Sequence, residues 1–350
     1  MSSRKPPASG SVTLEDVARV AGVSRATVSR VINGSTTVDP AMRVLVENAV
    51  AATDYVPNRA ARSLVTRRTD SIALVVSEAE QREVADPFLG RVFTDPFFGR
   101  VVTGVMEAIR PRGVQLVLML VDDAASRAGL VGYLRQGHVD GVVLICGHAA
   151  DPLPGMLADS RVPAVLSGRP GQPTPITFVE ADQRAGAVLA VDHLVATGRR
   201  RIATLAGPLD MPSAQERLAG FREALAGHGL AEAGMVEGDF TQAGGAAAMR
   251  ALLEQAPGFD AVFVGSDLMA LGALPVLGRA GLRVPEDVAL VGFDDSSAAL
   301  ACDPPLTTVR QPLEEMAARM AQLLLRQITE PGETQESVLF RPTLVLRESA

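Results

Sequence analysis

The chain has 350 residues, of which 47% are hydrophobic and only 4% aromatic, and its formal net charge is −7. This length predicts two or three domains, and the aliphatic composition favours helices packed on sheets. Two cysteines, Cys146 and Cys302, exclude a disulfide framework and a four-cysteine metal site. The apolar runs are too short to span a membrane, and the first ten residues lack the apolar segment of a signal peptide. We therefore expect a cytoplasmic protein.

Charge is divided unevenly along the chain. Residues 1–68 contain ten Lys and Arg against five Asp and Glu, whereas the remainder contains 23 against 35. A small basic unit thus precedes a large acidic one, which favours a nucleic-acid partner for the first unit over a merely solvated tail.

The segment VTLEDVARVAGVSRATVSRVING (12–34) predicts two short helices joined by a tight turn. Thr13 and Asp16 resemble a capping box, Gly22 ends the first helix, and Ser24 is placed to cap the second. The apolar residues expected to face the core are Leu14, Val17, Ala18, Ala21, Val28, Val31 and Ile32, with Ala26 or Thr27. The pattern is that of a helix-turn-helix, although an αα-hairpin with a solvated outer face would share it.

In a helix-turn-helix the second helix enters the major groove, and its N-terminal residues face base edges. Arg25, Ala26 and Arg30 occupy those positions, and an Arg side chain binds guanine O6 and N7 through two hydrogen bonds. The other DNA-binding candidates here are Thr13, Ser24, Thr27, Ser29 and Asn33, the last four at positions suited to phosphates. The sequence therefore predicts a unit that reads double-stranded DNA.

A third helix is predicted after Asp39, a candidate N-cap, and Pro40. The face expected to close the three-helix core consists of Met42, Leu45, Val46 and Ala49. Further on, Asn58 is placed to cap a short basic helix that contains Arg62 and Leu64. A helix of about eight residues is marginal in water, so we expect it to form only when something holds it.

The segments TLEDVARVAGVSRATVSRVING (13–34) and DYVPNRAARSL (54–64) resemble the DNA-binding headpiece and hinge of the lactose-repressor family of bacterial transcription regulators. The resemblance covers residues 12–65 almost without gaps. It implies that the hinge helix folds on operator DNA and pairs with that of a second copy. It also implies that Asn58 and Arg62 contact DNA and that Leu64 is wedged into the minor groove.

From Ser71 onward, apolar strands alternate with amphipathic helices, which predicts parallel sheets covered on both faces. One set of strands is SIALVV, VQLVLML, GVVLI and PAVLSG, and the second is ITFVEAD, RIATLAG, AVFVGSD and VALVGFDD. The fold class is therefore α/β, with a three-helix headpiece and a hinge helix followed by two doubly wound lobes.

Polar residues follow the carboxyl ends of these strands, where ligands bind in open α/β sheets. They are Arg169, Asp182, Ser266 and Asp294, and Arg217 lies one turn into a helix at the same face. Taken singly, each residue is more often a helix cap or a surface ion pair. Together, their carboxylates, guanidiniums and hydroxyl suit a small polyhydroxylated ligand.

Six further segments resemble the effector-binding region of lactose-repressor relatives and sugar-binding periplasmic proteins: DPFF (95–98), RLAGF (217–221), SDLMALGA (266–273), VGFDD (291–295), PPLTTVRQP (304–312) and TLVLRES (343–349). The resemblance implies that Arg217 and Asp294 bind effector hydroxyls or a carboxylate. It further implies that the same cleft is lined by Asp95, Phe97, Phe98, Arg169 and Ser266.

Two departures from the family pattern fall on this pocket. Relatives often have Asn where Ser266 stands, and DPFLGRVF (86–93) nearly repeats as DPFFGRVV (95–102), which lengthens the first loop. The identity of the ligand therefore stays open.

The expected organisation is a headpiece at 1–57, a hinge helix and linker at 58–69, and an effector-binding and dimerisation domain at 70–350. Within that domain, lobe 1 comprises about 70–175 and 308–335, and lobe 2 about 176–307 and 336–350. No leucine heptad follows TLVLRES, so we expect a dimer without the tetramerising extension of some relatives.

The sequence thus predicts a homodimeric repressor whose affinity for operator DNA is switched by a small molecule, with a carbohydrate preferred. Because GxGxxG, GxxxxGK[ST], HExxH and CxxC motifs are absent and the four histidines show no metal spacing, we expect no enzyme activity, cofactor, metal or membrane partner. One alternative is a regulator that depends on a purine or nucleoside corepressor. A solute-binding protein is the other, which the headpiece and the lack of a signal peptide disfavour.

Overall fold

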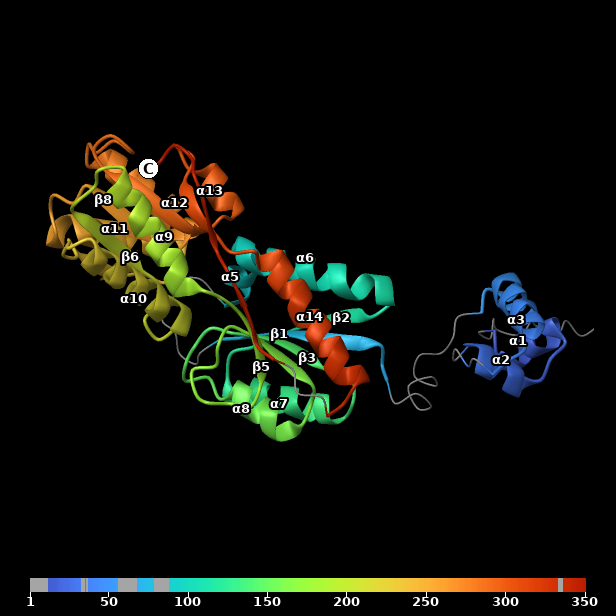
Figure 1. Cartoon of the computed structure of the whole chain (residues 1–350). Helices are drawn as coiled ribbons and strands as arrows, with labels where there is room; N and C mark the ends of the chain where they lie inside the picture. Colours follow the sequence, from blue (N-terminus) through green and yellow to red (C-terminus); the bar gives the residue numbers. More distant parts are fainter. Residues whose placement is uncertain (1–11, 33–34, 36, 56–67, 79–87, 333–335) are drawn as a thin grey trace, which may run out of the picture. The chain divides into compact units, whose positions relative to one another are not determined.

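The structure is a computed structural model that describes residues 12–32, 35, 37–55, 68–78, 88–332 and 336–350 (Figure 1). It divides into two compact units, Met1–Thr69 and Asp70–Ala350. Within the described ranges, no helix is both long enough and apolar enough to cross a membrane.

The first unit consists of the helices α1 (Leu14–Ala21), α2 (Arg25–Ile32) and α3 (Pro40–Thr53). The capping box before α1 forms as predicted, because Thr13 Oγ1 accepts from the Asp16 amide while Asp16 accepts from the Thr13 amide. Gly22 ends α1 with φ of 67°, a left-handed conformation that suits glycine and permits the tight turn into α2.

The core of this unit is small and aliphatic. It consists of Val17, Ala18, Val28, Val31, Val38, Val46 and Ala49. The prediction for α3 is half wrong, since Val46 and Ala49 are buried but Met42 and Leu45 are exposed. Leu45 is the neighbour of Val46 and lies about 100° from it around the axis of α3, so the core packs on a narrower face of this helix than predicted.

The first lobe of the second unit is built on a sheet of parallel strands in the order β11-β5-β4-β3-β1-β2. These are β1 (Ser71–Ser77), β2 (Gln115–Val121), β3 (Val142–Cys146), β4 (Ala164–Ser167), β5 (Thr177–Ala181) and β11 (Val338–Phe340). One face packs on α6 (Pro96–Ile109) and α14 (Leu313–Thr329), and the other on α7 (Ala124–Arg135) and α8 (Leu153–Ser160). The short α5 (Phe88–Thr94) precedes α6.

The second lobe repeats this plan with the strand order β12-β10-β9-β8-β6-β7. Its strands are β6 (Ile202–Ala206), β7 (Met235–Glu237), β8 (Ala261–Val264), β9 (Ala289–Asp294), β10 (Thr307–Arg310) and β12 (Thr343–Val345), of which β12 is antiparallel to β10. The helices α9 (Gln183–Ala196) and α10 (Pro212–Gly227) cover one face. The other face carries α11 (Gln242–Gln255), α12 (Asp267–Arg279) and α13 (Ser297–Ala301).

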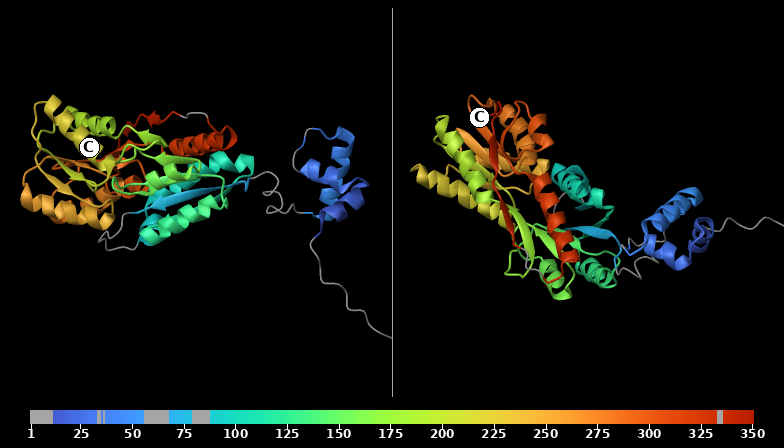
Figure 2. Two further views of the ribbon diagram at one scale, coloured as in Figure 1. Left: turned by 90° about the horizontal axis from the view of Figure 1, so that it is seen from below. Right: turned by 45° about the vertical axis from the view of Figure 1, so that its right-hand side comes forward.

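The chain passes between the lobes after β5, after β10 and after β11, and the last passage is the long red segment in Figures 1 and 2. The lobe boundaries predicted at residues 176, 308 and 336 are therefore wrong. The strands β5 and β11 belong to the first sheet, and β10 belongs to the second. Composition cannot show with which neighbour a strand pairs, and here each crossing follows the end of a strand.

Candidate ligand cleft and nucleic-acid interface

The predicted base-reading residues lie on an exposed face of α2. Arg25, Ala26 and Arg30 are all exposed, whereas Val28 and Val31 of the same helix are buried. Arg25 Nε lies 3.0 Å from Glu15 Oε1 of α1, so one predicted base reader is ion-paired within the unit.

The candidates for phosphate contacts begin at the N-terminus of α2. Ser24 Oγ accepts from the Thr27 amide at 3.1 Å and lies 2.9 Å from Thr27 Oγ1. An amide-rich helix N-terminus favours an anion such as phosphate. Thr13 caps α1 and Ser29 is half-buried on α2. The predicted residues Asn33, Asn58, Arg62 and Leu64, and with them the hinge helix, lie outside the described residues.

In the second unit, a cavity of about 210 Å³ lies where the carboxyl ends of the strands of both lobes meet. The predicted residues that line it are Asp95, Phe97, Phe98, Arg169, Arg217, Ser266 and Asp294. The strand ends predicted Arg169, Arg217, Ser266 and Asp294, and the family resemblance implied the other three. All seven residues lie around one cavity although they are far apart in sequence.

Arg217 is the buried cationic centre of this cleft. Its Nε donates to Gln183 Oε1 at 2.8 Å, its Nη1 donates to the Gly265 carbonyl, and its Nη2 lies 3.5 Å from Asp294 Oδ1. The guanidinium also lies 3.8 Å from the centre of the Phe293 ring, a cation–π contact. Burial lowers the pKa of Arg217, and the charges of nearby carboxylates oppose that effect.

Two glutamines close a ring of side chains around this cation. Gln183 Nε2 donates to Gln311 Oε1 at 2.9 Å, and Gln311 Nε2 donates to Asp294 Oδ1 at 2.6 Å. Gln183 and Gln311 stand on two of the passages between the lobes. The Arg217–Asp294 pair is therefore tied directly to the segments that connect the lobes.

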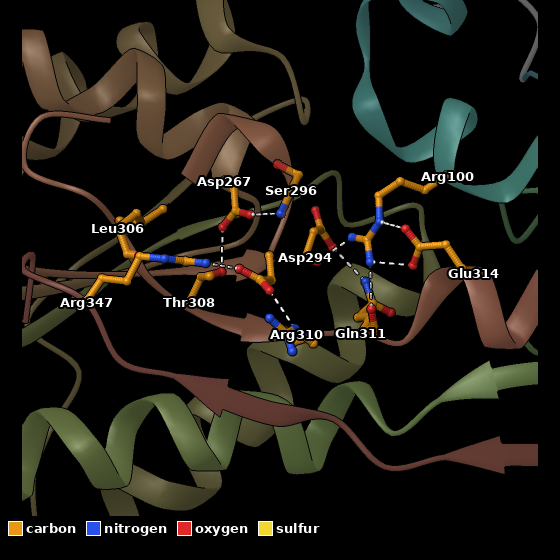
Figure 3. Close-up of polar contacts among 11 residues, drawn as sticks. Arg100, Asp267, Asp294, Ser296, Leu306, Thr308, Arg310, Gln311, Glu314 and Arg347 are labelled. Carbon is orange, nitrogen blue, oxygen red and sulfur yellow. Dashed lines mark hydrogen bonds and ion pairs between the residues drawn. The ribbon is translucent and has the colours of Figure 1, made fainter. Parts of the chain in front are cut away.

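Asp294 ends β9 in an unusual backbone conformation. Its φ is 108° and that of Asp295 is 50°, and Asp295 is fixed by Arg310 and Arg347. Arg100 of α6 donates from Nη1 to the Asp294 carbonyl at 2.7 Å while it pairs with Glu314 (Figure 3). Burial raises the pKa of Asp294, against the opposing effects of Arg217, Gln311 and Arg100. One residue thus presents its carboxylate to the cleft and its carbonyl to the other lobe.

Asp95 and two aromatic rings form the facing wall. Asp95 caps α6 by accepting from the Phe97 amide at 2.9 Å, and burial raises its pKa to about 6 although that hydrogen bond opposes the shift. Phe97 and Phe98 meet edge to face, with ring centres 5.3 Å apart. A carboxylate beside aromatic rings suits a ligand that has both hydroxyls and apolar C–H faces.

The prediction for Asp182 is wrong, because this residue does not line the cavity. Its carboxylate accepts from the Ala185 amide at 2.9 Å and caps α9, whereas the neighbouring Glu180 and Gln183 line the cleft. Asp182 follows the last residue of β5 and directly precedes α9, so its carboxylate serves as the cap of that helix instead of entering the cleft. Arg169 lines the cleft, but its side chain is 66% exposed and pairs with Glu180.

Several residues that line the cleft were not predicted from the sequence: Glu78, Arg100, His148, Glu180, Gln183, Phe240 and Gln311. Glu78 and His148 follow β1 and β3 closely, so the strand-end rule applied to every strand would have found them. Phe240 lies in a loop with φ of 63°, which no pattern indicated. Within the described ranges, no group of three or more His, Cys, Asp or Glu side chains could hold a metal ion.

Asp267 is fully buried behind the cleft (Figure 3). It accepts from the Ser296 amide at 2.7 Å and from Thr308 Oγ1 at 2.5 Å, and burial, reinforced by Asp294, raises its pKa to about 8. A carboxyl with a raised folded-state pKa stabilises the fold below its ordinary pKa of 3.8, and the contribution is lost as the pH rises through 8.

We expect the free energy of unfolding of Asp267→Asn to fall less than that of the parent as the pH rises from about 5 to 9, because the amide does not ionise. The Asn oxygen can accept from Ser296 while its nitrogen donates to Thr308. Urea unfolding across this range measures the effect. Asp267→Ala, which leaves both partners unsatisfied and does not ionise either, should be less stable than Asp267→Asn by about 2 kcal/mol at every pH. Equal pH slopes in Asp267→Asn and the parent would contradict the assignment.

Comparisons with known proteins support both units. Residues 13–58 match the model for bacterial regulatory proteins of the lacI family, and residues 191–350 match a periplasmic binding protein-like domain. The chain is 50% identical over 343 residues to the HTH-type transcriptional regulator CelR of Thermobifida fusca, covering 96% of this chain and 98% of that one. It is 35% identical to the ribose operon repressor of Escherichia coli, covering 97% and 99%.

Solved structures agree with these sequence relatives. A complex of the transcriptional regulator CelR with cellobiose matches with a TM-score of 0.75 and 46% identity, covering 97% of this chain and all of that one. The lac repressor dimer bound to operator and the anti-inducer ONPF matches with a TM-score of 0.80 and 30% identity, covering 97% and 99%.

Proposed function

The chain belongs to the lacI family of bacterial transcriptional regulators, and from this premise we propose that a neutral carbohydrate bound in its cleft switches its affinity for operator DNA. The observation that carries the proposal is the ring of Arg217, Gln183, Gln311 and Asp294, which joins a ligand site to the segments between the lobes. A ligand that contacts both lobes favours one arrangement of them, and only such differential affinity shifts an equilibrium.

The charges of the cleft favour a neutral ligand. Among the described residues, each positively charged side chain that lines the cavity already contacts a carboxylate: Arg100 with Glu314, His148 with Glu78, Arg169 with Glu180 and Arg217 with Asp294. Asp95 lines the same cavity without a cationic partner among the described residues. A phosphate group would therefore meet carboxylates and find its cations occupied, whereas sugar hydroxyls can donate to those carboxylates.

The cleft also has room for more than one sugar ring. A second cavity, of about 650 Å³, shares Glu78, Asp95, Phe98 and Phe240 with the first. Asp239, Thr241 and Gln242 contribute polar groups to it. The relative in complex with cellobiose binds a sugar of two rings, and we extend this disaccharide class to the present chain.

A thermal-shift panel of cellobiose, glucose, ribose, glucose 6-phosphate, a purine base and a nucleoside tests the ligand class. At 100 times its dissociation constant, a ligand adds about 2.7 kcal/mol to the free energy of unfolding. Cellobiose should raise the melting temperature and glucose 6-phosphate should not. Stabilisation by the purine alone would favour a corepressor-dependent regulator.

We extend to this chain the DNA contacts predicted for α2 and for the hinge residues Asn58, Arg62 and Leu64. One headpiece covers one half-site, so a symmetric operator requires a dimer. Its place of action would then be the cytoplasm, where operator DNA lies, and it would act by binding rather than as an enzyme.

Light scattering of the full chain should give twice its mass of 36.6 kDa without DNA, because the acidic second unit has to supply the interface. A monomer, or a mass four times that of the chain, would contradict this assembly.

A further inference from the structure

A histidine that lines the cleft bridges the two lobes. His148 follows β3 of the first lobe and is only 6% exposed. Its Nδ1 lies 2.6 Å from Asp210 Oδ2, which follows β6 in the second lobe, and its Nε2 contacts Glu78 Oε1 of the first lobe. Beside it, the Ala149 amide donates to the Asp210 carbonyl at 3.0 Å. Residues 148 and 149 thus hold one loop of the other lobe.

The numbers of hydrogen-bond donors and acceptors show which charge state of His148 this geometry requires. A neutral imidazole has one N–H, whereas the protonated ring has two and no acceptor. Carboxylates are acceptors only, and His148 has one at each nitrogen. Only the protonated ring can donate to Glu78 and Asp210 at once, so loss of the proton must break one of the two bonds.

We propose that His148 is a proton-dependent link between the lobes, which positions the cleft and makes its affinity for effector depend on pH. The second carboxylate determines the direction of the effect. Glu78 stays with His148 in the first lobe, but Asp210 comes from the second, so the arrangement that joins the lobes holds the proton more tightly. Protonation therefore favours the arrangement in which the cleft residues of both lobes come together.

The electrostatic surroundings support this direction. Burial alone lowers the pKa of His148, but its hydrogen bonds and charge interactions with Glu78 and Asp210 outweigh burial and raise it above 6.5. Among the described residues, the charged or titratable groups on the elements around it include Arg91, Arg127, Cys146, Asp151, Arg169 and Glu237. Arg91 pairs with Glu78 at 2.7 Å, and Arg127 lies 3.5 Å from Asp151. The link is therefore complete below about pH 6.5 and is lost as the pH rises through the raised pKa.

The first experiment needs no ligand and so does not depend on the proposed function. The full chain is labelled with ¹³Cε1-histidine, its four histidines are titrated by NMR, and the signal missing from His148→Gln is assigned to His148. We expect its pKa to lie above 6.5 and to fall in Asp210→Asn, which removes the charge supplied by the second lobe but keeps the size of the side chain. Asp192→Asn is the matched control, because Asp192 lies 2.6 Å from a different histidine, His228.

The second experiment rests on the proposed function and uses cellobiose as the probe. Calorimetric titration of the parent should show the dissociation constant rising by about fivefold or more between about pH 6.5 and pH 9. In His148→Gln the change should be smaller than about twofold, and any remaining slope reports other groups such as Asp95 and Asp267, which this variant retains.

The outcomes separate the two claims. If cellobiose does not bind but Asp210→Asn lowers the pKa of His148, the ligand class is wrong and the proton-dependent link stands. An Asp210→Asn variant that leaves the pKa of His148 unchanged overturns the link whatever the sugar does. A binding profile in His148→Gln as steep as that of the parent overturns its role in effector affinity.

Discussion

Arg217→Ala is expected to need about ten- to 150-fold more effector than the parent to change operator binding. Loss of one charged hydrogen-bonding group in a buried cleft costs about 1.5–3 kcal/mol of binding free energy. Arg217 is 7% exposed, joins Gln183 to Asp294 and lies in the cleft, so its loss removes the proposed ligand contact and opens the ring of side chains. Fluorescence titration of the effector against operator-bound protein measures the shift.

Two controls make this result interpretable. Arg217→Ala leaves Asp294 buried without its cation and is expected to unfold at a lower temperature than the parent, so Asp294→Asn, which lowers the charge without removing the side chain, is measured beside it. Arg222 lies on the same helix but pairs with Glu232 at an exposed site, so Arg222→Ala should respond to effector like the parent. A normal effector response in both Arg217→Ala and Asp294→Asn would place the ligand elsewhere.

Arg25→Ala is expected to weaken binding to the operator by about five- to 150-fold, because a bidentate Arg–guanine contact contributes about 1–3 kcal/mol of discrimination. Its affinity for random DNA should fall much less, since that binding depends mainly on phosphates. Anisotropy titrations on both DNAs at one salt concentration give the ratio.

The ion pair of Arg25 with Glu15 supplies a matched variant. Glu15→Gln releases Arg25 and removes a negative charge from the same helix pair, so operator affinity should equal or exceed that of the parent. Arg19→Ala removes an exposed charge of α1 that pairs with Asp16, and it should not alter the preference between bases. Equal losses on operator and random DNA for Arg25→Ala would remove it from base reading.

The fold of the headpiece could be predicted closely because local signals determine it. The capping box at Thr13, the glycine turn at Gly22 and the apolar spacing of Val17, Val28 and Val46 each act within a few residues. The exposure of Met42 and Leu45 could not be predicted, because apolar spacing does not show how wide a face of α3 the small core covers.

Local sequence signals predict the second unit less completely. The strands β1–β6, β8 and β9 followed from apolar runs, and the positions of Arg217 and Asp294 from the strand ends, whereas the short β7, β10, β11 and β12 were not in the predicted sets. The assignment of β5, β10 and β11 to sheets depends on pairing between distant strands. Gln183 lines the cleft in place of Asp182 because Asp182 caps α9 at the end of β5. The contact between His148 and Asp210 joins residues 62 apart across two lobes, which no periodicity can indicate.

The effect of a neutral carbohydrate on operator affinity can be measured directly. An operator is first selected from random DNA with the full chain, and its dissociation constant is then measured by anisotropy with and without saturating cellobiose. We expect this constant to change by at least about fivefold with cellobiose but not with glucose 6-phosphate, and to change in Arg217→Ala only at much higher sugar concentration. Cellobiose that binds the full chain while the dissociation constant for operator stays the same would contradict this expectation.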